Sequence, residues 1–519
     1  MKDIYLDTEQ EQQISLQRRL RQEILFARQR IYLAGSPTPL EKLELVDCPV
    51  DIWVKREDVS VIKAYKWRGA YNRMAAMSDT EAVGGVVTAS AGNHAQGVAL
   101  AAGQLGINAR IFMPRTTPEI KQQTVQRLGG NHINFQLSGD TYNESETEAL
   151  EYAKHNKSTF VHAYDDLLVM AGQGTMADEI TMSGQGPFDV AFLQIGGGGL
   201  AAGVACWLRL IWPEIKIIGV EGVGQASMQA ALNANRPVHL EELDIFCDGT
   251  AVHQVGDLTF TLCQQLLDDI ITVTNQEVSE AIRAMWDGLR AIPEPSGAMG
   301  LAGALKCTDA LAGKKCLTIL CGANLDFSKL APIAEATGVG LEARHHLRIK
   351  IAESPGSMLR LLDDALSGLS ITSFLYGKTD QSQAWPVFGL DCFAKSLDQL
   401  KQQLDDKAYD WEEVSGDEDI EFRTIACRSE LLTHPAFFQL SFYERPGALH
   451  EFLEETICGR ANICYFNYRY SGERIGRALI GLEFESLQQQ SEFLQWLPPS
   501  GKGYRRCKRV PDRVIERMI

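Results

Sequence analysis

The sequence Val54-Lys55-Arg56-Glu57-Asp58, continued at residues 64–71 by Ala-Tyr-Lys-Trp-Arg-Gly-Ala-Tyr, decides how the chain is interpreted. Residues 52–55 predict a strand that leads into this motif. Lys66 lies at its centre. A lone lysine is usually a solvated surface residue, whereas an amine that attacks a carbonyl must lose its proton. Burial or nearby positive charge would lower its pKa, and Lys63 and Arg68 are the nearest cations in sequence.

Two later stretches belong with this motif. The first, Ser90-Ala91-Gly92-Asn93-His94, lies between a predicted strand at 86–88 and a predicted helix at 93–105. The free amides of such a helix start form an anion site, although Ser or Asn there is also an ordinary N-cap. The second, Gly196-Gly197-Gly198-Gly199, follows an apolar strand and precedes a small-residue helix. Glycine lets the backbone approach a phosphate, but tight turns use glycine as well.

Between residues 84 and 320, short apolar strands alternate with helices. Further strands are predicted at 110–113, 133–135, 190–195, 217–220 and 315–320, and helices at 118–128 and 141–152. This alternation indicates an α/β fold with a mostly parallel sheet covered on both faces. Residues 8–31 predict a helix that packs on this body or on a neighbouring subunit.

The C-terminal third contains a tandem repeat. A predicted strand, a Glu-x-Pro-Gly turn that starts a helix, and a second strand occur at 344–351, 353–359 and 369–376. The same order recurs at 438–443, 444–449 and 463–470, and each copy has the size of a small βαββαβ unit. The acidic run at 410–421 is interpreted as a loop. These patterns predict domains at 1–335, 336–432 and 433–519.

Composition excludes several classes of protein. The net charge is −17 over 519 residues, which argues against nucleic acid as a partner, and the basic residues at 502–509 are interpreted as a solvated edge. Twelve cysteines without CxxC pairs or His-rich spacing favour reduced thiols in a cytoplasmic protein and no metal site. The apolar stretch at 190–212 is broken by four glycines and contains Arg209, so we expect no membrane span.

Together the three motifs resemble those of the fold-type II pyridoxal 5'-phosphate (PLP) enzymes, the tryptophan-synthase-β-like family. Within it the chain is most similar to the biosynthetic threonine dehydratases, or threonine ammonia-lyases, which carry ACT-like domains after their catalytic part. The resemblance implies a two-lobed α/β catalytic domain followed by tandem α+β, ferredoxin-like regulatory domains.

The resemblance also implies roles for single residues. Lys66 would form the Schiff base with PLP and then act as general base. Asn93 would face the ring oxygen of the cofactor, the four glycines at 196–199 would hold its phosphate, and Cys321 would face its pyridine nitrogen. Most free cysteines, however, are only buried small hydrophobic residues. The substrate carboxylate would be bound by the neighbours of Asn93, namely Ser90, Ala91, Gly92 and His94.

Two further stretches, 248–252 and 294–298, resemble family motifs that shape the cofactor site, and neither is assigned a catalytic step. In the second repeat, Asn467-Tyr468-Arg469 matches a regulatory motif of the family, whereas the first repeat has Leu375-Tyr376-Gly377. The first copy therefore gives a weaker prediction of an effector site than the second.

The implied activity is β-elimination and deamination of L-threonine, and more slowly of L-serine, to 2-oxobutanoate and ammonia. This is the first step of isoleucine biosynthesis, so we expect isoleucine to inhibit the enzyme and valine to oppose that inhibition. We also expect a homo-oligomer, either dimer or tetramer. One alternative is another fold-type II enzyme, such as a serine dehydratase or racemase. The other is a catalytically silent amino-acid sensor, because Lys63 and Ala64 depart from the family pattern.

Overall fold

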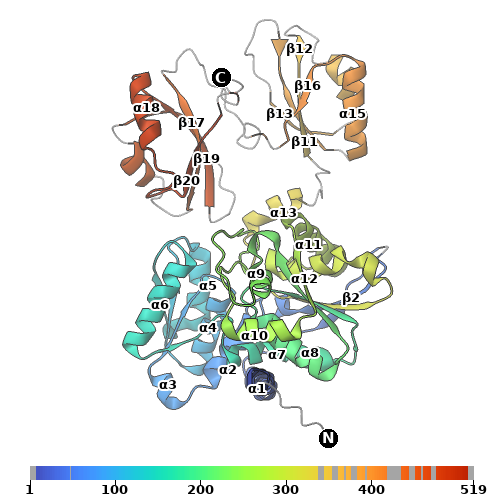
Figure 1. Cartoon of the computed structure of the whole chain (residues 1–519), viewed down its shortest axis with the longest axis vertical. Helices are drawn as coiled ribbons and strands as arrows, with labels where there is room; N and C mark the ends of the chain where they lie inside the picture. Colours follow the sequence, from blue (N-terminus) through green and yellow to red (C-terminus); the bar gives the residue numbers. More distant parts are fainter. Residues whose placement is uncertain are drawn as a thin grey trace. The chain divides into compact units, whose positions relative to one another are not determined.

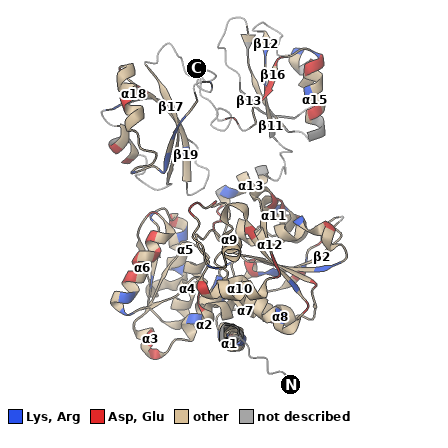
Figure 2. Cartoon of the chain, in the orientation of Figure 1, with Lys and Arg blue, Asp and Glu red and all other residues tan. Residues whose placement is uncertain are grey.

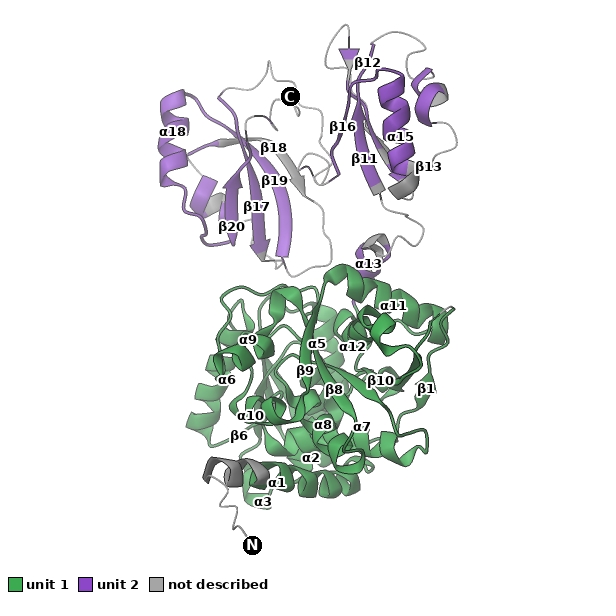
Figure 3. Ribbon diagram, turned by 45° about the vertical axis from the view of Figure 1, so that its right-hand side comes forward, with its two compact units in different colours: residues 1–325 green, residues 326–519 purple. Residues whose placement is uncertain are grey.

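The computed structural model describes residues 8–46, 48–336, 344–352, 360–366, 370–375, 383–391, 394–415, 417, 434–443, 451–457, 460–468, 475–511 and 513. The chain divides into two compact units, Met1–Leu325 and Asp326–Ile519 (Figure 3).

The larger sheet of the first unit has six strands in the order β1-β2-β10-β7-β8-β9. They are β1 (Leu40–Lys42), β2 (Asp51–Arg56), β10 (Lys315–Leu320), β7 (Val190–Gln194), β8 (Lys216–Gly222) and β9 (Asp269–Val273). Only β1 runs antiparallel to its neighbour, and the other pairs are parallel. The central strand β7 is buried at every position, as expected of a parallel sheet between two helix layers.

Helices cover both faces of this sheet (Figure 1). On one face they are α1 (Thr8–Ile31), α7 (Leu167–Met182), α8 (Gly199–Ile211) and α10 (Asp257–Leu266), and on the other α12 (Pro295–Lys306) with α11 (Asn275–Leu289) behind it. Helix α9 (Ser227–Ala234) follows β8. Helix α1 was predicted, and it packs on the α/β body of the first unit, where Leu20 and Ile24 are fully buried in the core with α7 and α8.

The second lobe of this unit is built on a parallel sheet in the order β5-β4-β3-β6. Its strands are β3 (Val86–Ala89), β4 (Ala109–Met113), β5 (Ile133–Leu137) and β6 (Thr159–Phe160). The helices of this part of the chain are α2 (Lys66–Ala75), α3 (Asp79–Val83), α4 (Asn93–Leu105), α5 (Glu119–Gly129) and α6 (Tyr142–Asn156). Short 3-10 turns lie at Glu57–Val59, Gly130–His132, Val223–Gln225 and Thr308–Leu311. The predicted two-lobed α/β architecture is therefore confirmed.

The second unit contains two antiparallel sheets of four strands with one topology, β13-β15-β11-β16 and β18-β19-β17-β20. The first comprises β11 (Arg344–Ile349), β13 (Ser370–Leu375), β15 (Val387–Asp391) and β16 (Trp411–Glu413). The second comprises β17 (Ala436–Tyr443), β18 (Asn462–Tyr468), β19 (Ile475–Glu483) and β20 (Arg506–Arg509). If the four strands of each copy are numbered along the chain, their order across the sheet is second, third, first and fourth. This is the ferredoxin-like arrangement implied by the resemblance.

The two copies share local details as well. Each second strand carries a β-bulge, between Ile371 and Ser373 in β13 and between Ile463 and Tyr465 in β18. Each copy has a π-helical turn, Leu362–Leu366 and Leu453–Ile457, and a later helix, α15 (Ala394–Asp406) and α18 (Leu487–Trp496). The remaining elements are the Phe327–Lys329 turn, α13 (Leu330–Ala336), β12 (Ile351–Ala352) and β14 (Gln383–Ala384). The tandem repeat is confirmed, while the Pro-Gly turns at 353–359 and 444–449 lie outside the described residues.

The prediction of a loop at 410–421 is wrong for its first residues, because Trp411–Glu413 form strand β16 beside β11. Charge pairing across the strands explains why so acidic a segment joins the sheet. Glu412 accepts a hydrogen bond from Arg348 at 2.8 Å, and Asp410 accepts one from Lys350 at 3.0 Å.

Acidic and basic residues occur together in helices such as α15 (Figure 2). The basic residues of β20 are mostly exposed on an edge strand, as predicted for a solvated edge, and lysine and arginine there discourage pairing with other chains. Across the residues that the structure describes, none of the helices combines the length and apolar character that crossing a membrane demands.

Candidate active site

The three sequence motifs meet at the carboxyl ends of parallel strands. Lys66 begins α2 soon after β2, the four glycines follow β7, and Cys321 follows β10, all in the larger sheet. Residues 90–93 follow β3 in the smaller sheet. The Tyr65 amide donates to the Cys321 carbonyl at 2.9 Å, which ties the start of α2 to the end of β10. Carboxyl edges of parallel strands are the usual place for ligand sites in α/β folds.

The Lys66 amine is held in surroundings that suit a nucleophile. Its Nζ donates to the Ala163 carbonyl at 2.8 Å. Desolvation by the surrounding protein lowers its pKa to about 8, although the nearby Cys321 and Glu294 oppose this change. The sequence left two possible causes of a lowered Lys66 pKa, burial and nearby positive charge. In the structure the cause is burial.

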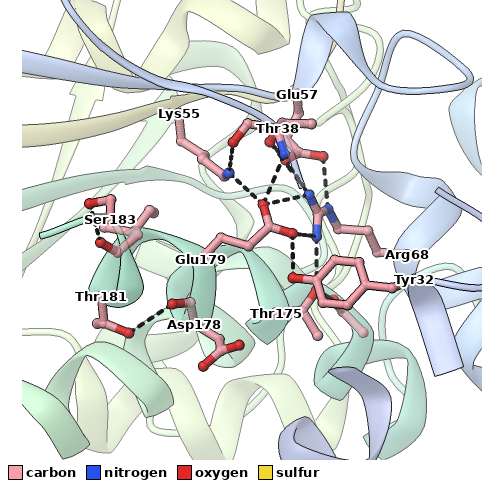
Figure 4. Close-up of polar contacts among 12 residues, drawn as sticks. Tyr32, Thr38, Lys55, Glu57, Arg68, Thr175, Asp178, Glu179, Thr181 and Ser183 are labelled. Carbon is pink, nitrogen blue, oxygen red and sulfur yellow. Dashed lines mark hydrogen bonds and ion pairs between the residues drawn. The ribbon is translucent and has the colours of Figure 1, made fainter. Parts of the chain in front are cut away.

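Arg68, which the sequence left as a possible neighbour of Lys66, belongs instead to a buried ionic network (Figure 4). Its guanidinium donates to both carboxylate oxygens of Glu57, at 2.8 and 2.9 Å, and to both of Glu179, at 2.6 and 3.0 Å. Lys55 pairs with Glu179 and also donates to the Thr38 carbonyl. The network joins β2, α2 and α7, so it fixes the helix that carries Lys66 to its surroundings.

The start of α4 offers an anion site. The Ser90 hydroxyl accepts from the Gly92 amide at 3.1 Å, and Gln96 is the first residue of the helix to bond backwards, to Gly92. The earlier amides of this turn therefore project from the helix end. A Cβ on Gly92 would meet open space, as expected of a position that faces a ligand.

The side chain of His94 points away from such a role. It is buried, and its Nε2 lies 3.0 Å from the Val161 carbonyl. Burial and the nearby Lys66 lower its pKa to about 3, so the ring is neutral at physiological pH. His94 can thus contribute its backbone amide to an anion site, while its ring packs inside the smaller lobe.

The glycine loop is shaped by close packing as well as by its helix end. A Cβ on Gly197 would lie 2.2 Å from the ring of Tyr164, and Gly198 has a positive φ of 94°. The Gly197 carbonyl accepts from the Thr259 hydroxyl at 2.6 Å. Because a peptide N–H points opposite to its carbonyl, this bond turns the Gly198 amide to the other side of the loop. That amide and the free amides at the N-terminus of α8 are donors of the kind that bind a phosphate.

The thiol of Cys321 is buried and neutral. Its Sγ lies 3.6 Å from the Ser296 carbonyl, and burial, assisted by the charge of Glu294, raises its pKa to about 12. Such a thiol can approach a pyridine nitrogen without protonating it, which fits the predicted role of a neutral partner.

Three residues near the site were missed by sequence reasoning, and each acts through a partner distant in sequence. They are Tyr164 and Thr259 at the glycine loop, and Asn324, whose Nδ2 donates to Asn93 at 2.7 Å. Glu294 lay in the stretch 294–298 that the sequence already linked to the cofactor site, and the structure adds its contact with Asn93. In the second unit, Asn467 and Tyr468 lie on β18, whereas Arg469 lies outside the described residues.

Comparison with protein families gives two matches along the chain. Residues 31–322 match the family described as pyridoxal-phosphate dependent enzyme. Residues 335–422 and 428–510 each match the C-terminal regulatory domain of threonine dehydratase. The chain is 39% identical to L-threonine dehydratase biosynthetic IlvA of Haemophilus influenzae, covering 90% of this chain and 91% of that protein. It is 38% identical to the Escherichia coli protein of the same name, with 87% and 89% covered.

Solved structures agree with this grouping. A processed form of threonine deaminase isoform 2 from Solanum lycopersicum is 41% identical, with a TM-score of 0.59 over 62% of this chain and 89% of that one. Maize serine racemase is 31% identical, with a TM-score of 0.55 over 60% of this chain and 96% of that one. The fold is thus shared by a protein named as a threonine deaminase and by one named as a serine racemase.

Proposed function

Because the chain belongs to the pyridoxal-phosphate dependent enzymes, in the group of biosynthetic threonine dehydratases, we propose that the site at Lys66 deaminates L-threonine to 2-oxobutanoate and ammonia. The chain is a lyase that depends on PLP, and the reaction begins isoleucine biosynthesis. The observation that carries the assignment is geometric: the buried Lys66 amine donates to the carbonyl of Ala163, and the next residue, Tyr164, packs its ring against the glycine loop at the start of α8.

The residues present fit the cofactor. The Gly198 amide and the start of α8 supply donors for a phosphate, and the neutral Cys321 thiol suits a pyridine nitrogen. We propose that the Asn93 amide donates to the ring oxygen, because its Nδ2 uses one N–H on Glu294 and has a second to offer. The pyridoxal group needs donors for its phosphate, a partner for its pyridine nitrogen and a donor for its ring oxygen. We assign to it Lys66, Asn93, Gly196, Gly197, Gly198, Gly199 and Cys321.

Once bound, PLP supplies an electron-withdrawing ring that stabilises negative charge at the substrate Cα. Amides at residues 90–94 hold the substrate carboxylate at the start of α4, where the helix dipole favours an anion. Lys66 in its neutral form takes the Cα proton, since an amine with a pKa near 8 is an effective base close to neutral pH. Loss of the β-hydroxyl as water, followed by hydrolysis, gives the products.

A direct assay tests this proposal. Purified protein with PLP should release 2-oxobutanoate from L-threonine, and Lys66→Ala should abolish both this activity and the visible absorbance of the bound cofactor. Retention of that absorbance in the variant would remove Lys66 from its proposed role. The serine racemase relative provides the second candidate function, and chiral analysis of products from L-serine separates the two. A silent sensor would release no ketoacid.

We further propose that the C-terminal copies bind branched-chain amino acids, with isoleucine inhibiting and valine opposing it. The matches at 335–422 and 428–510 support the domain boundaries 1–335, 336–432 and 433–519. Asn467, Tyr468 and Arg469 are the proposed effector residues. Isoleucine should inhibit the full chain and leave a chain without residues 336–519 unaffected; an equal response in both would refute the regulatory role.

The assembly and cellular location are proposals too. We propose a cytoplasmic homo-oligomer, either dimer or tetramer, without nucleic acid or membrane as partner. Light scattering of the purified chain gives the subunit count, and a monomer would contradict this expectation.

A further inference from the structure

The side-chain amide of Asn93 is held from both ends. Its Nδ2 donates to Oε1 of Glu294 at 2.6 Å, and its Oδ1 accepts from Nδ2 of Asn324 at 2.7 Å. The two partners come from the segment before α12 and the segment after β10, far from α4 in sequence. Asn324 is itself fixed, because its Nδ2 also donates to the Ile62 carbonyl at 2.8 Å.

These contacts permit only one orientation of the amide. If the Asn93 amide turned over, its oxygen would face the carboxylate oxygen of Glu294, and its NH2 group would face the NH2 group of Asn324. Both contacts are repulsive, and the turned amide would lose the two part-buried hydrogen bonds to Glu294 and Asn324. In the observed orientation, Asn93 keeps one N–H that is used by neither partner.

Glu294 lies inside the site and not at its margin. It is 6% exposed, and a Cβ on Gly322 would lie 2.2 Å from its Oε1 and 3.2 Å from Nδ2 of Asn93. A side chain at position 322 would therefore displace the Glu294 carboxylate from its place beside Asn93. The charge of Glu294 also raises the pKa of both Lys66 and Cys321, so it acts on the groups proposed to meet the cofactor.

We propose that Glu294 and Asn324 are positioning residues that fix the amide of Asn93, so that it offers a single N–H to the ring oxygen of the pyridoxal group. The inference rests on the proposed function of the site. Without the two partners, the amide rotates and presents its oxygen as readily as its N–H. A ring oxygen that loses a hydrogen-bond donor becomes harder to deprotonate.

Three variants test the proposal: Glu294→Ala, Glu294→Gln and Asn324→Ala. The Ala and Gln variants at 294 both remove the charge, but the Gln amide oxygen still accepts from Asn93. We expect Glu294→Ala to bind PLP roughly tenfold more weakly than Glu294→Gln, as loss of one such bond implies. The pH titration of the visible band should also have its midpoint at higher pH in the Ala variant. Asn324→Ala changes no charge and should shift both quantities in the same direction relative to wild type.

The measurements are equilibrium PLP binding to the apoprotein and the absorbance of the bound cofactor across pH. Ser145→Ala is the control, since Ser145 is buried in the smaller lobe and donates to the Ser138 carbonyl at 2.6 Å. It should lower the melting temperature without changing PLP affinity or the band. Equal behaviour of the two 294 variants, or an Asn324→Ala variant identical to wild type, would overturn the proposal. A wild-type chain with no visible band would overturn the proposed function as well.

Discussion

Replacement of Glu179 by Gln should destabilise the first unit strongly. The carboxylate accepts from the Tyr32 hydroxyl at 2.8 Å, from the Thr38 amide at 3.1 Å, and from Lys55 and Arg68. Lys55, Arg68, Glu57 and Glu179 form a neutral set whose side chains are all at most 6% exposed. The variant leaves one positive charge unbalanced, and the new amide NH2 faces groups that are themselves donors.

The size of the effect follows from this burial. Removing one partner of a buried ion pair costs about 3–5 kcal/mol. The first unit has 325 residues, and an unfolding entropy of roughly 2.1 cal/mol/K per residue gives about 0.7 kcal/mol/K for the whole unit. The melting temperature should therefore fall by about 4–7 °C. Calorimetry of the apoprotein at pH 7.5 measures this change without a contribution from cofactor binding.

Asp178→Asn is the matched control, because Asp178 is the neighbouring residue on α7 (Figure 4). Burial raises the pKa of Asp178, and its partner Arg28 is 45% exposed, so a neutral amide should be tolerated within about 1 kcal/mol. Lys55→Met combined with Glu179→Gln should recover part of the loss, since the remaining charges of Arg68 and Glu57 balance. Equal melting of Glu179→Gln and Asp178→Asn would refute this account of the network.

The same network predicts a pH dependence. Burial opposes ionisation of Glu179, but Arg68 and Lys55 outweigh it and hold its pKa below the ordinary value of 4.5. A lowered carboxyl pKa stabilises the folded chain above that ordinary value, and the contribution is lost as the pH falls through the folded pKa. The difference in melting temperature between wild type and Glu179→Gln should therefore shrink below pH 4.5. A constant difference down to pH 3 would contradict it.

Three further predictions concern the site. The rate at which apoprotein captures PLP should rise with pH to a plateau with its midpoint near 8, because only neutral Lys66 reacts; stopped-flow absorbance with a midpoint near 10.5 would contradict this. Cys321, with a pKa of about 12, should resist iodoacetamide at pH 9 in the folded apoprotein and react after unfolding, as mass spectrometry can establish. Gly197→Ala should weaken PLP binding at least roughly tenfold by displacing Tyr164, and Tyr164→Ala should partly restore it, as equilibrium dialysis would measure.

The strands and the glycine loop could be predicted because their patterns are local. Short apolar runs bounded by glycine indicate buried strands, and a helix that starts with free amides needs no distant partner to be recognised. Helix α7 was not predicted, for a physical reason. It is buried on nearly all sides between α1, α2 and α8, so it lacks the polar face that produces a 3.6-residue period.

Contacts between distant residues explain why the ionic network, the partner of Asn93 and strand β16 were missed. Arg68 meets Glu179 across 111 residues, and Asn93 meets Glu294 across 201. Each member of such a pair has an ordinary local context, and a single sequence contains no sign of which carboxylate a given cation will meet. Strand β16 was missed similarly, since its acidic residues become favourable only opposite the basic residues of β11.

The placement of Arg68 helps to explain why the pKa of Lys66 stays low in a protein rich in carboxylates. Residues two apart on a helix point about 200° apart, so Lys66 and Arg68 face opposite sides of α2. Arg68 engages Glu57 and Glu179 on one side, while Lys66 meets a backbone carbonyl on the other. A carboxylate paired directly with Lys66 would raise its pKa and keep the amine protonated. The network therefore does more than anchor the helix, because it holds the charges of Glu57 and Glu179 on the side of α2 where they do not raise the pKa of Lys66.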